Sequence, residues 1–420
     1  MKFKIRNREF FEKAEEDLLA PYATKSKVAH ITRIYNEEEH PYRTAFQRDR
    51  DRIIHSRAFR RLKHKQQVFL ISEGDHYRTR LTHTLEVSQL ARTMAKALGL
   101  NEELVEAIAL GHDLGHTPFG HVGEVVLDNI LSGNDNLDGF LTGDNFGGFK
   151  HNYQSVRVVD LIEKKYRFDG LNLTSYVREG ILKHTHLYRE KYLYPDFNFQ
   201  GLHFEIDVAT TIEGQIVAIC DEIAQRTHDL EDGVRAGLVE LEQVRNVDII
   251  ALIEKMYGIK NLLNQDRYTY RNEIIRGLIN FLVNDIISTS LKNIASFYQR
   301  KKRLDYFDEE IVRFSDQINP LQLQLNQFIY KEIIFKGRGH EINSQNKNII
   351  RKLFQCILKN PVHLPKYIFN RIKKVDTKQQ QQFNSENNVR FLRIIADHIA
   401  SMTDRFAVLE FEKLNRNRNS

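Results

Sequence analysis

The sequence predicts an all-α protein with a multi-helix core and a helical C-terminal region. Apolar residues recur at intervals of three and four from Arg48 to the C-terminus, whereas alternating strand patterns are rare. Only 7 prolines interrupt the 420 residues. We expect an N-terminal arm over residues 1–45, a core over 46–235, and a helical region over 236–420 that is a candidate for oligomerisation or regulation.

The best-defined helices lie in the first half of the core. One is predicted over Thr79–Leu98, closed by Gly99 in a left-handed conformation. Asn101 can cap the next, which runs to about Leu114 and carries acidic residues at its positive N-terminal end. A third begins near His121 and ends before the loop Ser132–Gly148. Further helices are predicted near Asn152–Lys165, Thr174–Lys183 and Thr211–Asp229.

The segments between and beyond these helices read as irregular. The N-terminal arm contains one short helix, and a small hairpin is expected near Val68–Arg78. Tyr188–Phe204, with tyrosine, proline and asparagine, is predicted to be a long exposed loop. The run Gln379–Gln382 and the C-terminal NRNRNS are expected to be flexible.

Composition narrows the possible partners and the compartment. The net charge is +6 and the sequence pI about 9.0, which suits a nucleotide or nucleic acid but is also ordinary for a soluble protein. Weak binding of single-stranded DNA is therefore a possible property. Cys220 and Cys356 are too few for a disulfide framework, which indicates a reducing compartment. No secretory signal and no run of 18 apolar residues is found, so we expect a cytoplasmic protein without a membrane segment.

Two histidines and an aspartate are predicted to meet between helices. His83 is in helical register with Val87, and His112 lies on the apolar stripe of its own helix. Asp113 follows about 100° further around that helix. A single inward histidine is usually a hydrogen-bonded core residue, but two of them beside a buried carboxylate favour a divalent metal ion.

Asp221 is the candidate for a fourth ligand. It follows the apolar run Ile216–Cys220, where a carboxylate needs a partner. The alternative is a salt bridge to a core arginine. Imidazole and carboxylate ligands without cysteine suit Mn, Fe, Co or Zn, with Mg also possible, and they favour hydrolysis over a structural metal.

Five ordered segments carry a resemblance to a known family. They are Asp49–Phe69 (DRDRIIHSRAFRRLKHKQQVF), Arg78–Val87 (RTRLTHTLEV), Gly111–Gly123 (GHDLGHTPFGHVG), His151–Val156 (HNYQSV) and Cys220–Gly233 (CDEIAQRTHDLEDG). Over roughly residues 40–235 the chain resembles the HD-domain deoxynucleoside triphosphate triphosphohydrolases, the bacterial dGTPase-like proteins. The resemblance implies an HD metal-dependent phosphohydrolase core; the C-terminal region offers no motif.

The resemblance assigns roles to individual residues. It implies that His83, His112, Asp113 and Asp221 bind the metal, and that His121 and Glu124 are the catalytic histidine and its acidic partner. A plain helix N-terminus with an acidic third residue is the alternative for the last two. His116, counted with the catalytic residues, and His151 would face phosphate. Arg80 would contact the triphosphate, and Gln67 and Asp229 the sugar.

One position departs from the family pattern. Many relatives have a tyrosine four residues after the last ligand, where it stacks on the deoxyribose, but this chain has Gln225. Glutamine can bond a sugar hydroxyl but cannot exclude a ribose by bulk. His184 and His186 suggest a second metal, but without nearby carboxylates we favour surface or supporting roles. Lys63, Lys65, Arg60 and Arg61 are either phosphate-binding residues or a solvated basic face.

The implied reaction is metal-dependent hydrolysis of dGTP, or of dNTPs in general, to a deoxynucleoside and tripolyphosphate. The metal would act as a Lewis acid on the α-phosphoryl group, and His121 would protonate the departing 5′-oxygen. Alternatives are another HD phosphohydrolase acting on nucleotides or DNA 3′ ends, and a nucleotide sensor without turnover. Homo-oligomerisation and an allosteric dNTP site are implied by resemblance only.

Overall fold

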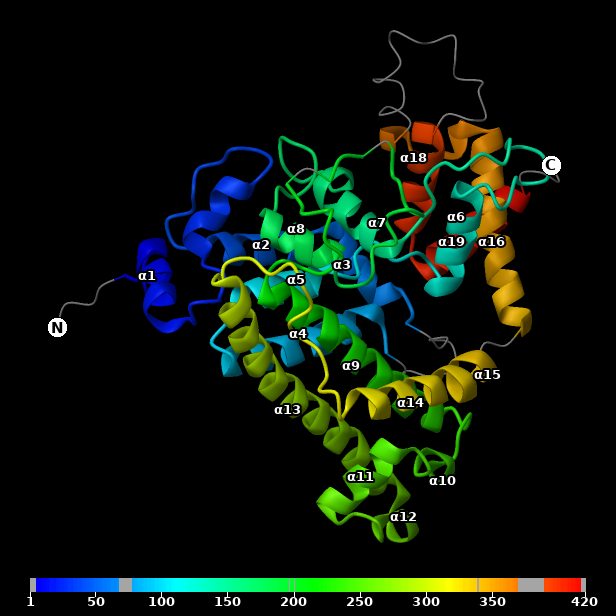
Figure 1. Ribbon diagram of the computed structural model, residues 1–420. Coiled ribbons are helices and arrows are strands. Elements are labelled where there is room, and N and C mark those ends of the chain that lie inside the picture. Colours follow the sequence, from blue (N-terminus) through cyan, green and yellow to red (C-terminus); the bar gives the residue numbers. More distant parts are fainter. Residues whose placement is uncertain are drawn as a thin grey trace.

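The computed structural model describes residues 5–67, 78–195, 197–199, 201–337, 340–368 and 389–416. Within these ranges the chain is helical and its only β-type pairings are two isolated bridges, which confirms the all-α prediction. The first and last described helices, α1 and α19, lie on opposite sides of the view in Figure 1. The predicted hairpin and the segment Gln379–Gln382 lie outside the described residues, although a Gln66–Thr79 bridge brings together the chain on either side of the former.

The N-terminal arm contains α1 (Arg8–Leu18) and a 3-10 helix, η1 (Ser26–Thr32), one more helical segment than predicted. It is fastened to the core by polar contacts. The buried Glu213 carboxylate accepts hydrogen bonds from the backbone and hydroxyl of Thr24, at 2.8 and 3.0 Å. The Arg33 guanidinium pairs with the buried Asp49. These contacts satisfy carboxylates that would be costly to bury alone.

The centre of the core consists of helices packed on α4 (Arg80–Ala97) and α5 (Glu102–Gly111). Thr79 caps α4, and the Leu100 amide bonds back to Ala95 after a left-handed Gly99, as predicted. Asn101 caps α5, which ends at Gly111, so His112 and Asp113 lie in the turn that follows the helix. Helices α2 (Ala45–Ile54), α8 (Ser175–Leu182) and α9 (Ile212–Arg235) enclose this pair, while α3 (Arg57–Arg61) and η2 (Leu62–His64) lead towards α4.

The next segments follow the prediction. Helix α6 (His121–Leu131) begins where expected, and the predicted helix near Asn152–Lys165 is α7 (His151–Arg157) continued by a π-helical turn, η4 (Val158–Ile162). The described residues of 188–204 form no helix and many of them are exposed, as predicted for a loop, but some aromatic side chains point inward. Tyr192 and Tyr194 are buried, and Tyr194 stacks on Tyr153 at 4.9 Å. Aromatic burial holds this segment against the core.

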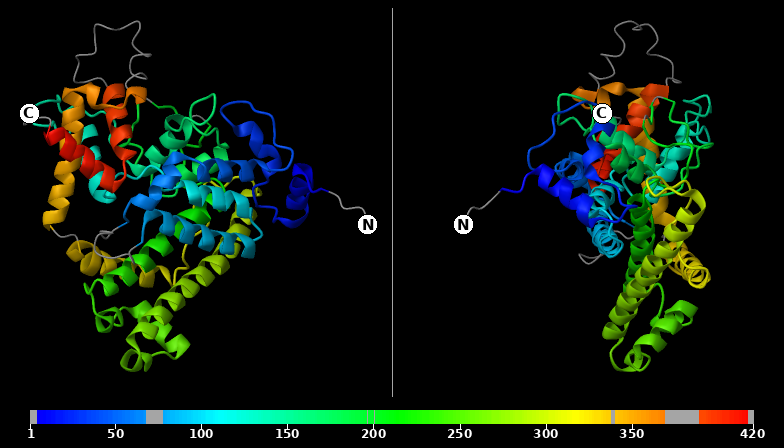
Figure 2. Two further views of the ribbon diagram at one scale, coloured as in Figure 1. Left: turned by 180° about the vertical axis from the view of Figure 1, so that it is seen from behind. Right: turned by 60° about the vertical axis from the view of Figure 1, so that its left-hand side comes forward.

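Beyond α9 the chain forms two groups of helices. The first comprises α10 (Leu241–Val244), α11 (Asp248–Tyr257), α12 (Leu262–Gln265) and the long α13 (Arg267–Lys301), and it projects from the body (Figures 1 and 2). Among the described helices, α13 alone is long and apolar enough to cross a membrane, but its buried face packs on α9 and α11, as in a core helix.

The second group is α14 (Asn319–Ile329), the π-helical η5 (Tyr330–Ile334), α15 (Phe335–Gly337), α16 (His340–Lys359), η6 (Pro361–His363), α18 (Val389–Ala400) and α19 (Asp404–Arg416). Helices α16, α18 and α19 bury apolar residues against α6 and form a second hydrophobic cluster (Figure 1). The C-terminal region therefore packs directly on the helix that carries His121 and Glu124.

The turn after α5 depends on a glycine. The Gly115 amide donates to the Ser155 hydroxyl, and a Cβ at Gly115 would collide with backbone atoms of His151 and Ser155 on α7. We predict that Gly115→Ala lowers the free energy of unfolding by about 1–3 kcal/mol. The added methyl group would meet the backbone of α7, which cannot move aside as the end of a flexible side chain can. Denaturant unfolding measures this. Ser344→Ala, on an exposed face of α16, is the control; equal stability of both variants would contradict the packing argument.

Candidate active site

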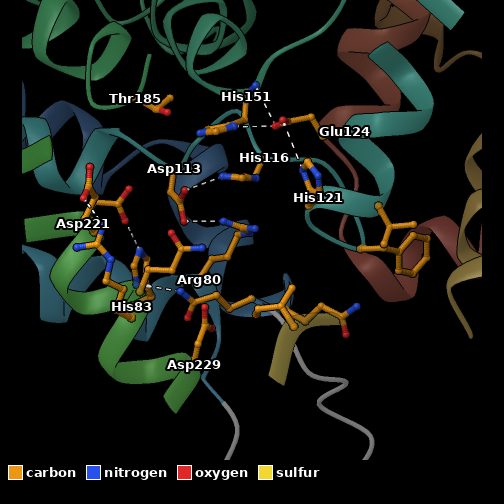
Figure 3. Close-up of a pocket in the computed structure, with 18 of the residues that line it drawn as sticks. Arg80, His83, Asp113, His116, His121, Glu124, His151, Thr185, Asp221 and Asp229 are labelled. Carbon is orange, nitrogen blue, oxygen red and sulfur yellow. Dashed lines mark hydrogen bonds and ion pairs between the residues drawn. The ribbon is translucent and has the colours of Figure 1, made fainter. Parts of the chain in front are cut away.

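A cavity of about 540 Å³ lies between the core and the C-terminal region (Figure 3). Most of the residues singled out in the sequence line it: Gln67, Arg80, His83, Asp113, His116, His121, Glu124, His151, Asp221, Gln225 and Asp229. His112 lies behind this surface, almost fully buried. The structure thus brings the predicted site residues together from α4, the turn after α5, α6, α7 and α9.

His83, His112 and Asp113 form a buried group with ligand atoms within 4.8 Å of one another. Asp221 reaches the same place from α9: its Oδ1 is 2.9 Å from His83 Nε2 and 3.6 Å from His112 Nε2. An Asp113 oxygen is also 3.6 Å from His112 Nε2. The alternative of a salt bridge between Asp221 and a core arginine is not seen, because the ion-pair partners of this carboxylate in the described chain are histidines.

The donor atoms of this group fit a divalent metal ion. His112 Nδ1 donates to the Ala109 carbonyl at 2.6 Å, which turns Nε2 and its lone pair towards the two aspartates. That Nε2 is buried and has no hydrogen-bond partner. Buried polar atoms are nearly always satisfied, so an unpartnered imidazole nitrogen facing two carboxylates indicates a cation ligand. The chemistry of the donors does not identify the metal.

The protonation of the group agrees with a cation site. Burial lowers the pKa of His112, but the carboxylates of Asp113 and Asp221 more than reverse this and raise it to about 9. Burial opposes ionisation of Asp113, yet Arg80, His116 and His112 hold its pKa well below the usual range. The two carboxylates therefore stay charged and favour a positive charge on His112 or between the side chains. A metal ion would displace that proton.

Further residues orient this group. Arg80 Nη1 donates to Asp113 Oδ2 at 2.9 Å, so the arginine implied to contact triphosphate also fixes a predicted ligand. Gln67 Nε2 and His228 Nδ1 lie 3.0 and 3.3 Å from His83 Nδ1. Helical periodicity predicts that His228 shares a face with Asp221 and looks into the same cleft, but it assigns this histidine no role. Ligand imidazoles commonly bond a second residue through the other nitrogen.

A second histidine–carboxylate group adjoins the first. His116, Glu124 and His151 form it, and the rings of His116 and His151 stack with centroids 3.9 Å apart. His151 Nδ1 lies 2.7 Å from Glu124 Oε2, while His121 Nδ1 is 3.8 Å from Glu124 Oε1. The Glu124 carboxylate is thus bound more closely to His151 than to its expected partner. His121 is half exposed and stands at the edge of the cavity (Figure 3).

Burial controls the charge of this second group. It lowers the pKa of His116 well below the usual range, with help from Arg80 and His151, so this imidazole is neutral. Burial opposes ionisation of Glu124, but His151, His121 and Lys150 hold its pKa well below normal. Lys150 Nζ is 3.4 Å from Glu124 Oε1. The Nε2–H of neutral His116 donates to Asp113 Oδ1 at 3.0 Å, so its Nδ1, which has no partner, carries the lone pair and is an acceptor.

His184 is a supporting residue rather than a surface one. Its Nδ1 donates to the Ile181 carbonyl, and its Nε2 is 3.1 Å from His151 Nε2. Burial and the nearby His112 and His151 lower its pKa to about 3. His186, by contrast, is exposed. The sequence KHTH therefore contributes one buried neutral imidazole between the two groups.

The C-terminal region supplies contacts that sequence reasoning did not find. Buried Lys65 donates to the carbonyls of His116 and, at 2.8 Å, of Ala400. The Asp404 carboxylate accepts from the Gln66 and Phe119 amides, both at 2.9 Å. The turn between α18 and α19 thus joins the two loops that carry Gln67 and His116. No motif in the sequence links Lys65 and Asp404 to their distant partners. The only available signal is that a lysine and an aspartate in buried positions need such partners.

Comparisons with known proteins agree with this site. Residues 80–226 match the HD domain family, and residues 312–413 match the phosphohydrolase-associated domain. An all-helical fold with this match, around buried His and Asp side chains that could bind a metal, defines an HD-class phosphohydrolase, a class that depends on metal.

Curated relatives narrow the class. A deoxyguanosinetriphosphate triphosphohydrolase-like protein of Ruegeria sp. (strain TM1040) is 39% identical over 405 residues, covering 94% of this chain and 99% of the relative. Similarly named proteins of Geobacter sulfurreducens and Syntrophus aciditrophicus are 38% and 37% identical over 94% and 96% of this chain, and over 94% of each relative. The chain belongs to the family of deoxyguanosinetriphosphate triphosphohydrolase-like proteins.

We predict that His112→Gln abolishes metal binding. The wild-type protein should retain about one Mn²⁺ or Co²⁺ per chain after desalting, as a four-ligand site does. Added metal should also raise its melting temperature, because the ligand binds the folded state. The variant should lose both effects, whereas His203→Ala, a half-exposed histidine away from the cavity, should keep them. Equal metal content of His112→Gln and wild type would rule out this ligand group.

Proposed function

We propose that this protein hydrolyses deoxynucleoside triphosphates to a deoxynucleoside and tripolyphosphate, using one divalent metal ion. The observation that supports this most is the adjacency of two groups in one cavity. The group around His112 and Asp113 can hold a cation, and the group of His116, Glu124 and His151 borders it, with Arg80 and Lys150 lining the same cavity. Hydrolysis of a triphosphate would use both groups, because phosphoryl transfer relies on positioning and charge stabilisation.

The ion would be held by His83, His112, Asp113 and Asp221. When bound, it supplies Lewis acidity at the phosphoryl group to be attacked. Arg80, already oriented by Asp113, presents its remaining N–H groups to phosphate oxygens. Lys150 adds positive charge at the cavity wall, and His116 Nδ1 can accept a hydrogen bond there, because the single N–H of this neutral ring is directed at Asp113. These residues bind and orient the triphosphate chain.

His121 is the proposed general acid for the departing 5′-oxygen of the deoxynucleoside. Its half exposure permits exchange of the proton with solvent after each turnover. Glu124 is the buried anion nearby, and its carboxylate can orient the imidazole. At 3.8 Å the two side chains are an ion pair rather than a tight hydrogen bond, so we expect a shorter contact in the substrate complex.

The sugar is proposed to lie along Gln67, Gln225 and Asp229. All three line the cavity, and Gln67 also contacts the His83 ring at 3.0 Å. Amide and carboxylate groups can bond a 3′-hydroxyl. We further propose a cytoplasmic location, where dNTPs occur. Homo-oligomerisation, a separate allosteric dNTP site and weak binding of single-stranded DNA stay predictions from the sequence.

The reaction is tested by its products. Metal-loaded wild-type protein with each of the four dNTPs should release deoxynucleoside and tripolyphosphate, separated by ion-exchange chromatography. His121→Ala should lower kcat by about 10²- to 10⁴-fold, the usual contribution of a general acid. His30→Ala, on the N-terminal arm, is the control. Orthophosphate, pyrophosphate or a nucleotide as product would reject the proposed cleavage, and an unchanged kcat for His121→Ala would reject this acid.

Gln225 is expected to affect the preference for deoxyribose over ribose. An amide leaves room for a ribose 2′-hydroxyl that an aromatic ring would exclude. We predict that Gln225→Tyr raises the ratio of kcat/KM for dNTP over the matching NTP by about tenfold or more, in line with pocket selection by bulk. Gln225→Asn, which keeps the amide, should leave the ratio near that of wild type. A ratio in Gln225→Tyr that stays the same or falls would show that this position does not border the sugar.

A further inference from the structure

One wall of the cavity belongs to the C-terminal region, and its residues are not among those proposed to bind the metal, the phosphates or the sugar. It consists of Asn326, Ile329, Tyr330, Ile334, Asn343 and Asn346, from α14, η5 and α16. None of these side chains is charged. Glu222 and Arg226 line the same cavity from α9, but they pair with each other at 2.6 Å. A surface of amides, aliphatic groups and one aromatic ring suits an uncharged ligand group rather than phosphate.

The position of this wall relative to the charged residues indicates which part of a bound dNTP would contact it. Figure 3 shows His151, Glu124 and Thr185 at one end of the cavity and Asp229 at the other, with Arg80 and His83 between them. Helices α14 and η5 pack on α9, which carries Asp229. A dNTP with its phosphates among Arg80, His116 and His151 and its sugar near Asp229 therefore directs its base towards the uncharged wall.

Tyr330 is the aromatic residue of this wall. It is 61% exposed although it lines the cavity, so it stands at the opening. No ring contact involves it among the described residues. It begins a π-helical turn between α14 and α15, an irregularity that frequently accompanies functional sites. An exposed ring at a cavity mouth offers a flat face for stacking of a nucleobase.

Asn346 is the buried polar residue of this wall. It is only 9% exposed, and no hydrogen bond from its amide to any described residue is present. Its amide atoms are not among the fully enclosed polar atoms that lack a partner, so they are open to the cavity. Asn carries one acceptor oxygen and two donor hydrogens, and this combination can form paired hydrogen bonds with the edge of a base. The Asn346 amide is therefore available to bind a polar ligand group at this place.

We propose that the wall formed by α14, η5 and α16 is the nucleobase subsite: Tyr330 stacks on the base, and Asn346 hydrogen-bonds to its edge and sets the preference among dNTPs. This rests on the proposed dNTP hydrolysis. It assigns substrate selection to the phosphohydrolase-associated region, while the HD region supplies the metal and the phosphate contacts.

The test uses the full-length, metal-loaded protein with dATP, dGTP, dCTP and dTTP. Tyr330→Ala should raise KM for every dNTP by about 5- to 100-fold, the range that loss of base stacking gives, with kcat within about threefold. Tyr330→Phe should behave as wild type. Tyr268→Ala, an equally exposed tyrosine on α13, is the matched control. Since Tyr330 is exposed, its substitution does not threaten folding.

Asn346→Leu should reduce the ratio of kcat/KM between the best and the worst dNTP by about tenfold, because the base edge loses its hydrogen-bonding partner. An unchanged KM and base ranking in Tyr330→Ala and Asn346→Leu would overturn the inference while leaving dNTP hydrolysis intact. A change confined to the dNTP-to-NTP ratio would also overturn it, since the wall would then contact the sugar. If wild type releases tripolyphosphate from no dNTP, the proposed function fails first.

Discussion

Two carboxylates, the buried Asp113 and the partly buried Asp221, constrain the rest of this structure. Both face the Nε2 atom of His112, which has no hydrogen-bond partner. Burying an unpaired charge in a helical core destabilises the folded state by more than a single packing contact stabilises it. Neighbouring side chains partly compensate these charges: Arg80 pairs with Asp113, and His83 pairs with Asp221. Gln67 and His228 lie close to the other ring nitrogen of His83. A cation among these side chains would complete the arrangement.

The C-terminal region is part of the same site rather than an appendage. Lys65 ties the His116 carbonyl to the end of α18, and Asp404 ties together the Gln66 and Phe119 amides. Burial lowers the pKa of Lys65 to about 7, which reflects how completely this linkage is enclosed. Helices α16, α18 and α19 also share a hydrophobic cluster with α6. Movement of these helices would therefore displace His116 and Glu124 at the cavity.

Sequence alone could predict much of this because the relevant patterns are local. Thr79 and Asn101 are capping residues, Gly99 ends a helix, and His83, His112 and Asp221 interrupt apolar stripes, so helical periodicity turns them inward. The remainder depends on contacts between segments far apart in the chain. The approach of Glu124 to His151 rather than His121, the burial of Tyr194 and the wall around Tyr330 follow from how helices pack, which no local pattern records.

The central claim is that four side chains bind one ion. Crystals of the protein grown with Mn²⁺ and measured at its absorption edge test this most directly. The account predicts a single anomalous peak about 2.0–2.2 Å from His83, His112, Asp113 and Asp221. A peak between His116, Glu124 and His151 instead, or none at either group, would contradict it.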